Sequence, residues 1–99
     1  MARFDVFQDK HGSFLLLDLQ SDLLDGIKTR VVAPLFPVSD MYWQIGKLNP
    51  RFDVGGITYV MATHRMGAIE AQELGPLVTS LSAHADRILA ATDFLFQGF

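Results

Sequence analysis

The hydrophobic pattern of this chain changes its period once, and that change limits the folds available to it. As far as residue 80, apolar residues come in short runs separated by turn-forming residues, which is typical of strands. The remaining segment has the three- and four-residue spacing of one helix face: Leu81, Ala85, Ile88, Leu89, Thr92, Leu95 and Phe96. The sequence therefore predicts a mainly β fold that ends in a helix.

The first third of the chain has the pattern of a hairpin followed by a third strand. Residues 3–8 alternate like a strand with one covered face, and residues 9–12 form a turn. Residues 14–19 return as a second strand, whose continuous apolar run predicts cover on both faces. Residues 30–35 predict a third strand. Pro34 places it at a sheet edge or at its own end, because proline has no backbone N–H.

A second hairpin is predicted further along the chain. It spans residues 52–61, where Gly55-Gly56 suits the positive-φ turn that joins twisted strands. Residues 41–50, just before it, mix helical and loop signals. A short strand is expected at residues 68–71, and Gly75-Pro76 is expected to interrupt the pattern after it.

Residues 20–29 are mostly polar and predict a loop between the second and third strands. Leu23 and Leu24 interrupt this polar segment. Two adjacent leucines in a loop are either tucked beneath it or exposed for a partner. The residues alone leave both interpretations open.

No group of residues has the spacing of a catalytic or metal site. His11, His64 and His84 lie too far apart in the sequence for the i, i+4 pairing of metal ligands. The carboxylates of the Asp22–Asp25 loop could suggest a cation site, but such residues more often bond backbone groups in turns. We therefore expect no enzyme, no metal and no cofactor. A small enzyme that uses His64 or this loop is the alternative.

Composition and charge narrow the range of partners. The chain has 99 residues, the size of a single domain spanning residues 1–99. Its net charge is −3 and its basic residues are scattered, so direct nucleic acid binding is not expected. A hydrophobic content of 49% is high for so small a monomer, and a homodimer would cover part of that surface.

Cysteine usage and the first residues indicate the compartment. The chain has no cysteine, which excludes disulfides and thiolate metal sites. Asp5 and Asp9 interrupt the only stretch that could serve as an apolar signal region. The longest apolar run, residues 14–17, is far shorter than the roughly 20 residues that a membrane span needs. We therefore expect a cytoplasmic protein with no membrane contact.

Aromatic residues gather at the end of the predicted helix. Ser82 is the expected N-cap of that helix, and Gly98 is placed to end it in the left-handed conformation. Phe96 can face the core, whereas Phe94 points elsewhere and Phe99 lies beyond the helix. These rings either seal the barrel end as a docked tail or anchor another protein, because desolvated aromatic contacts dominate binding energy. Composition does not choose between the two.

The ordered set of these segments resembles a known family. The set comprises Arg3-Phe4-Asp5-Val6-Phe7, Gln20-Ser21-Asp22-Leu23-Leu24-Asp25, Arg30-Val31-Val32-Ala33-Pro34-Leu35, then Gly55, Met61, Thr63 and Met66, and Leu81-Ser82 before the helix. The chain ends with Phe96-Gln97-Gly98-Phe99. Together these segments resemble the CcdB-type toxins of toxin–antitoxin modules, which end with Phe-Trp-Gly-Ile. The resemblance covers essentially the whole chain and is weakest over residues 36–51.

The resemblance implies an SH3-like antiparallel barrel with a small additional sheet and a C-terminal α-helix, assembled as a homodimer. It also implies a toxin that binds the DNA gyrase A subunit and traps the complex of gyrase with cleaved DNA. A cognate antitoxin with a disordered segment would wrap the toxin, free gyrase and, with the toxin, repress their shared operon. The antitoxin would make the DNA contacts.

The family's gyrase-binding positions map onto particular residues of this chain. The predicted surface consists of Leu23, Leu24, Asp93, Phe96, Gln97, Gly98 and Phe99. Gln97 replaces the family tryptophan that stacks on a gyrase arginine, and an amide lacks the π face for a contact worth about 0.5–2 kcal/mol. Asp93 replaces an asparagine. The alternative is therefore an inactive relative that only binds its antitoxin and co-represses their operon.

Overall fold

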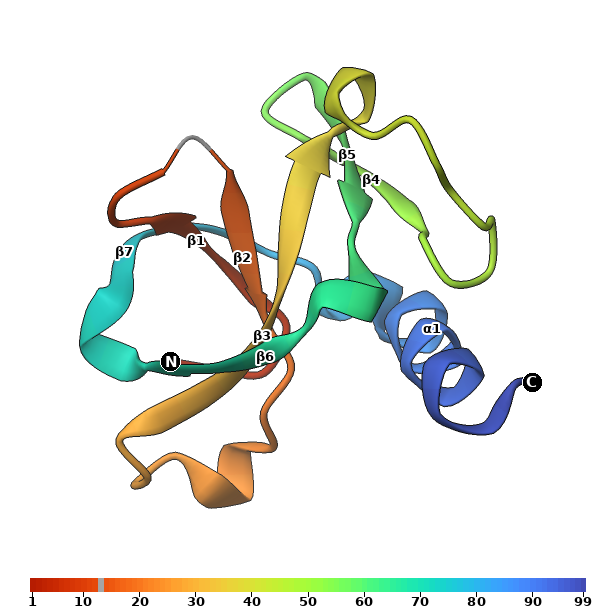
Figure 1. Cartoon of the computed structure of the whole chain (residues 1–99). Coiled ribbons are helices and arrows are strands. Elements are labelled where there is room, and N and C mark those ends of the chain that lie inside the picture. Colours follow the sequence, from red (N-terminus) through yellow and green to blue (C-terminus); the bar gives the residue numbers. More distant parts are fainter. Residues whose placement is uncertain (13) are drawn as a thin grey trace.

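The computed structural model describes residues 1–12 and 14–99. Its first half contains β1 (Asp5–Asp9), β2 (Leu15–Asp18), the 3-10 helix η1 (Asp22–Leu24), β3 (Thr29–Pro37) and the 3-10 helix η2 (Val38–Asp40). Its second half contains β4 (Arg51–Val54), β5 (Ile57–Met61), η3 (Thr63–Arg65), β6 (Gly67–Glu70), η4 (Ala71–Glu73), β7 (Leu74–Ser80), η5 (Ser82–His84) and α1 (Ala85–Gln97). The predicted mainly β fold with a C-terminal helix is confirmed (Figure 1).

β3 organises the sheet because it changes partner along its length. One edge pairs with β2. On the other edge, residues 29–32 pair with β6 and residues 35–37 pair with β5. The antiparallel strands therefore form two groups that share β3 (Figure 1). One is a curled half-barrel in the order β6-β3-β2-β1-β7, and the other is the small additional sheet β4-β5-β3.

The prediction that Pro34 lies at a sheet edge or at the end of its strand is wrong, because β3 has strands on both sides and continues to Pro37. Proline is tolerated at this point because its missing N–H falls between the last residue paired with β6 and the first paired with β5. Its carbonyl still accepts the N–H of Ala62, at 2.8 Å. The gap between two partner strands thus accommodates the proline.

The main core lies between the small sheet, the strands of the half-barrel and α1. Ile88 of α1 belongs to a cluster of buried residues that includes Leu17, Leu35, Phe52 and Met61. All three leucines of β2 are buried, which confirms the predicted cover on both faces of that strand. α1 buries Ile88 and Ala91 and leaves the last residues of the helix in solvent.

Two predictions for the last third of the chain are wrong. β7 continues through Gly75-Pro76, which was expected to interrupt the pattern. Pro76 fits because β7 is an edge strand and its register with β1 shifts at this point. Ser82 lies in η5, and α1 begins only at Ala85 with His84 at its N-cap position and no side-chain cap.

The predicted glycine positions are confirmed. Gly55 and Gly56 both have positive φ in the turn between β4 and β5. Gly98 ends α1 in the left-handed conformation, with φ of 80°, and its N–H donates to the carbonyl of Phe94 at 2.9 Å. Across residues 1–12 and 14–99, no helix has the length and apolarity needed to cross a bilayer.

Candidate protein-binding surface

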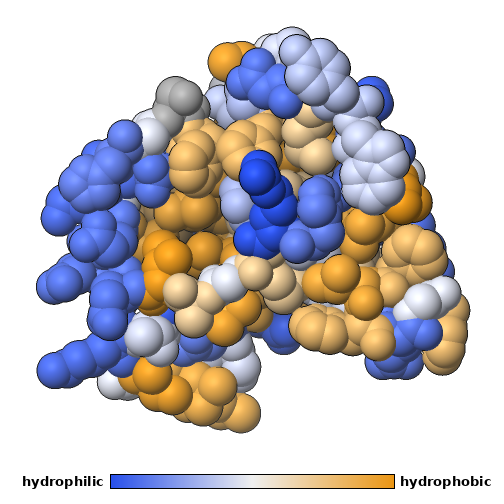
Figure 2. All heavy atoms as spheres, in the orientation of Figure 1, coloured by the Kyte–Doolittle hydropathy of each residue, from blue (hydrophilic) through white to orange (hydrophobic). Residues whose placement is uncertain are grey.

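η1 holds the paired leucines of the 20–29 loop, and both of them face solvent. Leu23 is 94% exposed and Leu24 is 48% exposed. Figure 2 shows hydrophobic atoms at the bottom of the molecule, where η1 lies in Figure 1. The leucines are therefore not tucked beneath the loop, and the interpretation that they are exposed for a partner remains.

Side-chain hydrogen bonds from the start of the loop hold η1 in this position. Ser21 Oγ accepts the N–H of Leu23 at 3.2 Å, and Asp22 Oδ1 accepts the N–H of Arg3 at 2.8 Å. Gln20 links the two ends of the loop, because its amide donates to the carbonyl of Leu24 and accepts the N–H of Val31. The polar residues thus bond backbone groups, as expected, and present the two leucines.

A buried ion pair supports the loop from behind. Arg30 and Asp18 have fully buried side chains, and the guanidinium of Arg30 donates to the carboxylate of Asp18. The same guanidinium reaches Asp25 Oδ1 at 3.2 Å, on the far side of η1. Sequence reasoning missed this pair. Opposite charges at the ends of two neighbouring apolar strands were the signal that could have indicated it.

The end of α1 forms the second exposed apolar group. Phe96 is 73% exposed and Phe99 is 74% exposed, and Gln97 and Gly98 are also exposed. The docked-tail interpretation is therefore wrong, because neither ring seals the barrel. Figure 2 shows hydrophobic atoms at the lower right, where α1 ends in Figure 1.

An apolar groove joins these two groups of residues. It encloses about 340 Å³, and both Leu24 and Phe96 line it. Two predicted surface residues that are far apart in the sequence thus meet across one groove. The lining residues that sequence reasoning did not assign to this site are Arg3, Phe4, Leu19, Gln20, Ser21, Val31, Met66, Ile88, Leu89 and Thr92. For most of them the sequence pattern indicates only a strand or core-face position.

Phe4, a buried residue of the groove lining, has an unfavourable backbone conformation. Its φ is 72°, in the left-handed region that side chains with a Cβ rarely adopt. Two backbone hydrogen bonds hold it there: its N–H donates to Asp18 and its carbonyl accepts from Leu81. The same hydrogen bonds fix the backbone that carries the Phe4 side chain of the groove lining.

The polar side chains of the groove already have partners within the protein. Gln20 and Ser21 bond the loop backbone, Thr92 Oγ1 donates to the carbonyl of Leu89, and Arg3 Nε donates to the carbonyl of Leu19. An incoming ligand therefore finds few open hydrogen-bonding groups and mostly apolar surface. The groove is suited to a bulky apolar side chain of a partner protein.

The remaining candidate residues lie outside the groove. Asp93 is exposed on α1, and Leu23 is exposed beside Leu24 without lining the cavity. The three histidines are exposed and far from one another in the sequence. In the part of the chain that the structure describes, no three metal-ligating side chains come together.

Comparison with known proteins agrees with this fold. The family model described as CcdB protein matches residues 3–98. A solved endoribonuclease in complex with its cognate antitoxin, from a mycobacterial species, superposes with a TM-score of 0.78 at 13% sequence identity. The match covers 97% of this chain and 94% of that chain. Among curated proteins, none matches the sequence.

Proposed function

The chain belongs to the CcdB family, and on that premise we propose that it is a toxin that binds the gyrase A subunit. In this proposal it traps gyrase on cleaved DNA, and a disordered segment of a cognate antitoxin neutralises it. The observation that carries the proposal is the exposure of Leu23, Leu24, Phe96 and Phe99 beside one apolar groove. A stable core lies behind these residues, so they are available to a partner without unfolding.

The proposed mechanism needs no catalytic group in this chain. Gyrase cleaves DNA, and the bound toxin holds the cleaved complex by filling a surface of the A subunit. The apolar groove and the exposed rings provide binding energy through desolvation. A homodimer would present two such surfaces and cover additional apolar area. Because gyrase is the target, we propose a cytoplasmic location.

The central test uses purified protein, gyrase and supercoiled plasmid. Linear DNA that appears after detergent and protease treatment measures the trapped complexes. We expect the wild-type protein to produce linear DNA with gyrase and none without it. Leu23→Asp is expected to reduce the linear DNA at least about tenfold, because a carboxylate at a desolvated contact is strongly unfavourable.

The matched control is Ile57→Asp, at a site that is 51% exposed on the β4–β5 turn. It introduces the same charge away from the groove and is expected to leave trapping unchanged. If the wild-type protein traps no cleaved complex, gyrase poisoning is refuted. An equal loss of linear DNA with Leu23→Asp and Ile57→Asp would show that the gyrase-binding surface does not lie at the groove.

Gln97 is the observation that favours the second candidate function, an inactive relative that binds its antitoxin and co-represses the operon. It is the exposed last residue of α1, where the family has a tryptophan. An amide there gives a weaker contact with an arginine. This candidate function requires that antitoxin binding use other contacts.

Gln97→Trp is expected to strengthen gyrase binding by about 2- to 30-fold, the equivalent of about 0.5–2 kcal/mol from a cation–π contact. The matched control is Gln97→Leu, which adds apolar surface but no π face and should gain less. Titration of gyrase A subunit against each labelled variant measures the effect. Equal affinities for the Trp and Leu variants would show that a π contact is not what the chain lacks.

A further inference from the structure

A small cavity lies between α1 and the segment that joins η2 to β4. It encloses about 210 Å³ and is lined by Gly46, Lys47, Pro50, Arg87 and Ala90. Among these described residues, two are cations and none is a carboxylate. Figure 1 shows the segment as the long yellow-green loop at the right, whose lower part approaches α1. None of the five residues lines the apolar groove, so the cavity is a separate feature of the surface.

Aromatic rings hold the two cations of the cavity. Lys47 Nζ is 5.8 Å from the centre of the Phe94 ring, and the guanidinium carbon of Arg87 is 4.7 Å from the centre of the Phe52 ring. Within residues 1–12 and 14–99, neither cation takes part in an ion pair. The rings therefore position the two charges without neutralising them, and both charges remain available to an anion.

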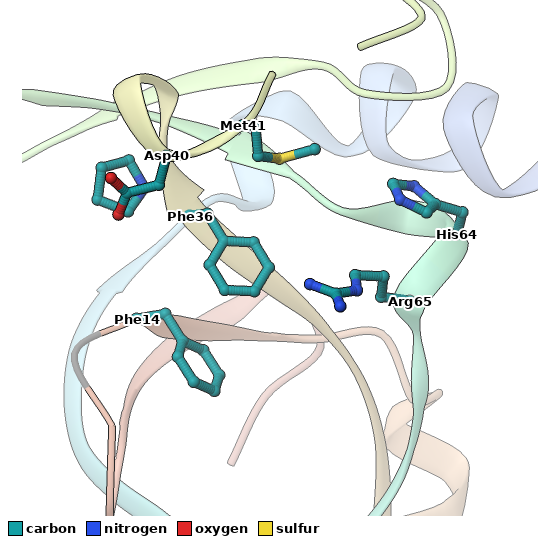
Figure 3. A pocket seen from close by; sticks show the side chains of 7 residues that line it. Phe14, Phe36, Asp40, Met41, His64 and Arg65 are labelled. Atoms are coloured by element: carbon teal, nitrogen blue, oxygen red, sulfur yellow. The ribbon is translucent and has the colours of Figure 1, made fainter. Parts of the chain in front are cut away.

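Exposed aromatic side chains precede the cavity in the same segment. Tyr42 is fully exposed and Trp43 is 60% exposed. Trp43 lies edge-on against His64, with the two ring centres 5.7 Å apart. Figure 3 shows His64 together with Met41, the residue before Tyr42, in the lining of another cavity. Trp, Tyr and Arg are the residue types that most often dominate protein interfaces, so this combination favours a protein partner.

Hydrogen bonds connect the aromatic part of the segment to the cations and to the core. Gln44 Oε1 accepts from Nη2 and Nε of Arg51 at 2.9 and 3.2 Å, and the carbonyl of Arg51 accepts from Arg87 at 2.6 Å. The side chain of the buried Asn49 donates to the carbonyl of Met61 in β5, at 3.0 Å. The segment is thus positioned before a ligand binds, which lowers the entropic cost of binding.

The charges favour a short acidic protein segment over a nucleic acid. Arginine and lysine both donate charge-assisted hydrogen bonds to a carboxylate, and the cavity has room for one such side chain. A short segment meets mainly the two local cations, because salt screens charges over about 8–10 Å. A polyanion such as DNA extends beyond them and is repelled by a chain that has a net charge of −3 and exposes Asp86 and Asp93 on the same helix.

We propose that the cavity and Trp43 together form a docking surface for an acidic protein segment. A carboxylate side chain of this segment binds between Lys47 and Arg87, and a neighbouring apolar side chain packs against Trp43. Arg87 lies on the opposite side of α1 from Leu89 and Phe96, which line the apolar groove. The docking surface is therefore additional to the proposed gyrase contact and does not depend on it.

The probe is the acetylated and amidated peptide Ser-Gly-Leu-Glu-Glu-Leu-Ser-Gly, with a twin that has Gln in place of both Glu residues. Amide NMR of the isotope-labelled full chain gives the affinity and the location. Trp43 is the only tryptophan, so its fluorescence gives a second measure of binding at this surface. We expect shifts at Trp43, Lys47 and Arg87, with the Glu peptide bound at least about fivefold more tightly than its twin. Added salt should reduce this preference.

The double variant Lys47→Gln with Arg87→Gln is expected to remove the preference for the Glu peptide. Its amide spectrum shows at the same time whether it is folded. The matched control is Lys10→Gln with Lys28→Gln, which removes the same charge at two exposed positions outside the cavity lining. This control is expected to keep the preference. The comparison separates a local site from the effect of net charge.

Four results would overturn the inference. They are equal affinity of the two peptides for the wild-type protein, an equal loss of preference in the two double variants, shifts confined to the groove of Leu24 and Phe96, and the absence of any shift. Tighter binding of a single-stranded oligothymidine at Lys47 and Arg87 would identify a nucleic acid ligand and overturn it as well. The experiment contains no gyrase, so its failure leaves the proposed gyrase contact standing. A lack of trapped gyrase complexes, in turn, leaves this docking surface standing.

Discussion

A variant that ends at Phe96, without Gln97, Gly98 and Phe99, is expected to trap no cleaved gyrase complexes and to stay folded. Phe99 is 74% exposed, and the three residues contribute nothing to the buried core cluster. Their removal costs the hydrogen bond from Gly98 to Phe94 and exposes the end of α1. We expect a loss of about 1 kcal/mol or less in the free energy of unfolding, against complete loss of trapping.

Thermal unfolding and the plasmid-linearisation assay separate the two effects. The point variant Phe99→Ala keeps Gly98 and the end of the helix, and should lower trapping with no measurable change in melting temperature. A fall of more than about 15 °C in the shortened variant would mean that the tail carries core packing after all. Full trapping by that variant would exclude the tail from the gyrase contact.

Arg30→Met is expected to lower the free energy of unfolding by about 3–5 kcal/mol. It leaves the carboxylate of Asp18 buried without its cation. Among the residues that the structure describes, only the N–H of Gln20, at 3.0 Å, then still bonds this carboxylate. The contact with Asp25 is lost too, so η1 is held less firmly. Because a domain of this size has a stability of about 5–15 kcal/mol, the variant approaches the unfolding threshold.

Urea unfolding of the matched variants tests the role of the pair. Arg51→Met removes an exposed arginine whose side chain, within residues 1–12 and 14–99, bonds only Gln44. It should lower the free energy of unfolding by about 0.5 kcal/mol or less. Replacing both members, Arg30→Met with Asp18→Asn, is expected to recover part of the loss because no unpaired charge remains. If Arg30→Met lowers the free energy of unfolding by less than about 1 kcal/mol, the ion pair between Arg30 and Asp18 does not support the loop.

Local chemistry explains what could be predicted from the sequence. Gly55-Gly56 and Gly98 were predictable because positive φ is a property of one residue in its own turn. The sequence alone does not decide the exposure of Leu23 and Leu24, because this exposure depends on hydrogen bonds from Gln20, Ser21 and Asp22 to backbone groups. The family resemblance proposed the residues of the surface, and the structure shows that they are exposed.

Long-range pairing explains what could not be predicted. Pro34 has the local signature of an edge, and only the change of partner along β3 makes a central position possible. Pro76 is tolerated because β7 has a neighbour on one side only. The groove between Leu24 and Phe96 requires that η1 and α1 meet in space, which no local pattern encodes.

β3 is a common wall of two cavities. Val31 lines the groove beside Leu24 and Phe96, whereas its neighbour Val32 lines a second cavity together with Leu16 and Ile69. Successive residues of a strand point to opposite faces, so the thickness of one strand separates the two cavities. A change of side chain at Val31 therefore alters the first cavity and a change at Val32 the second, although the two residues are adjacent in the chain.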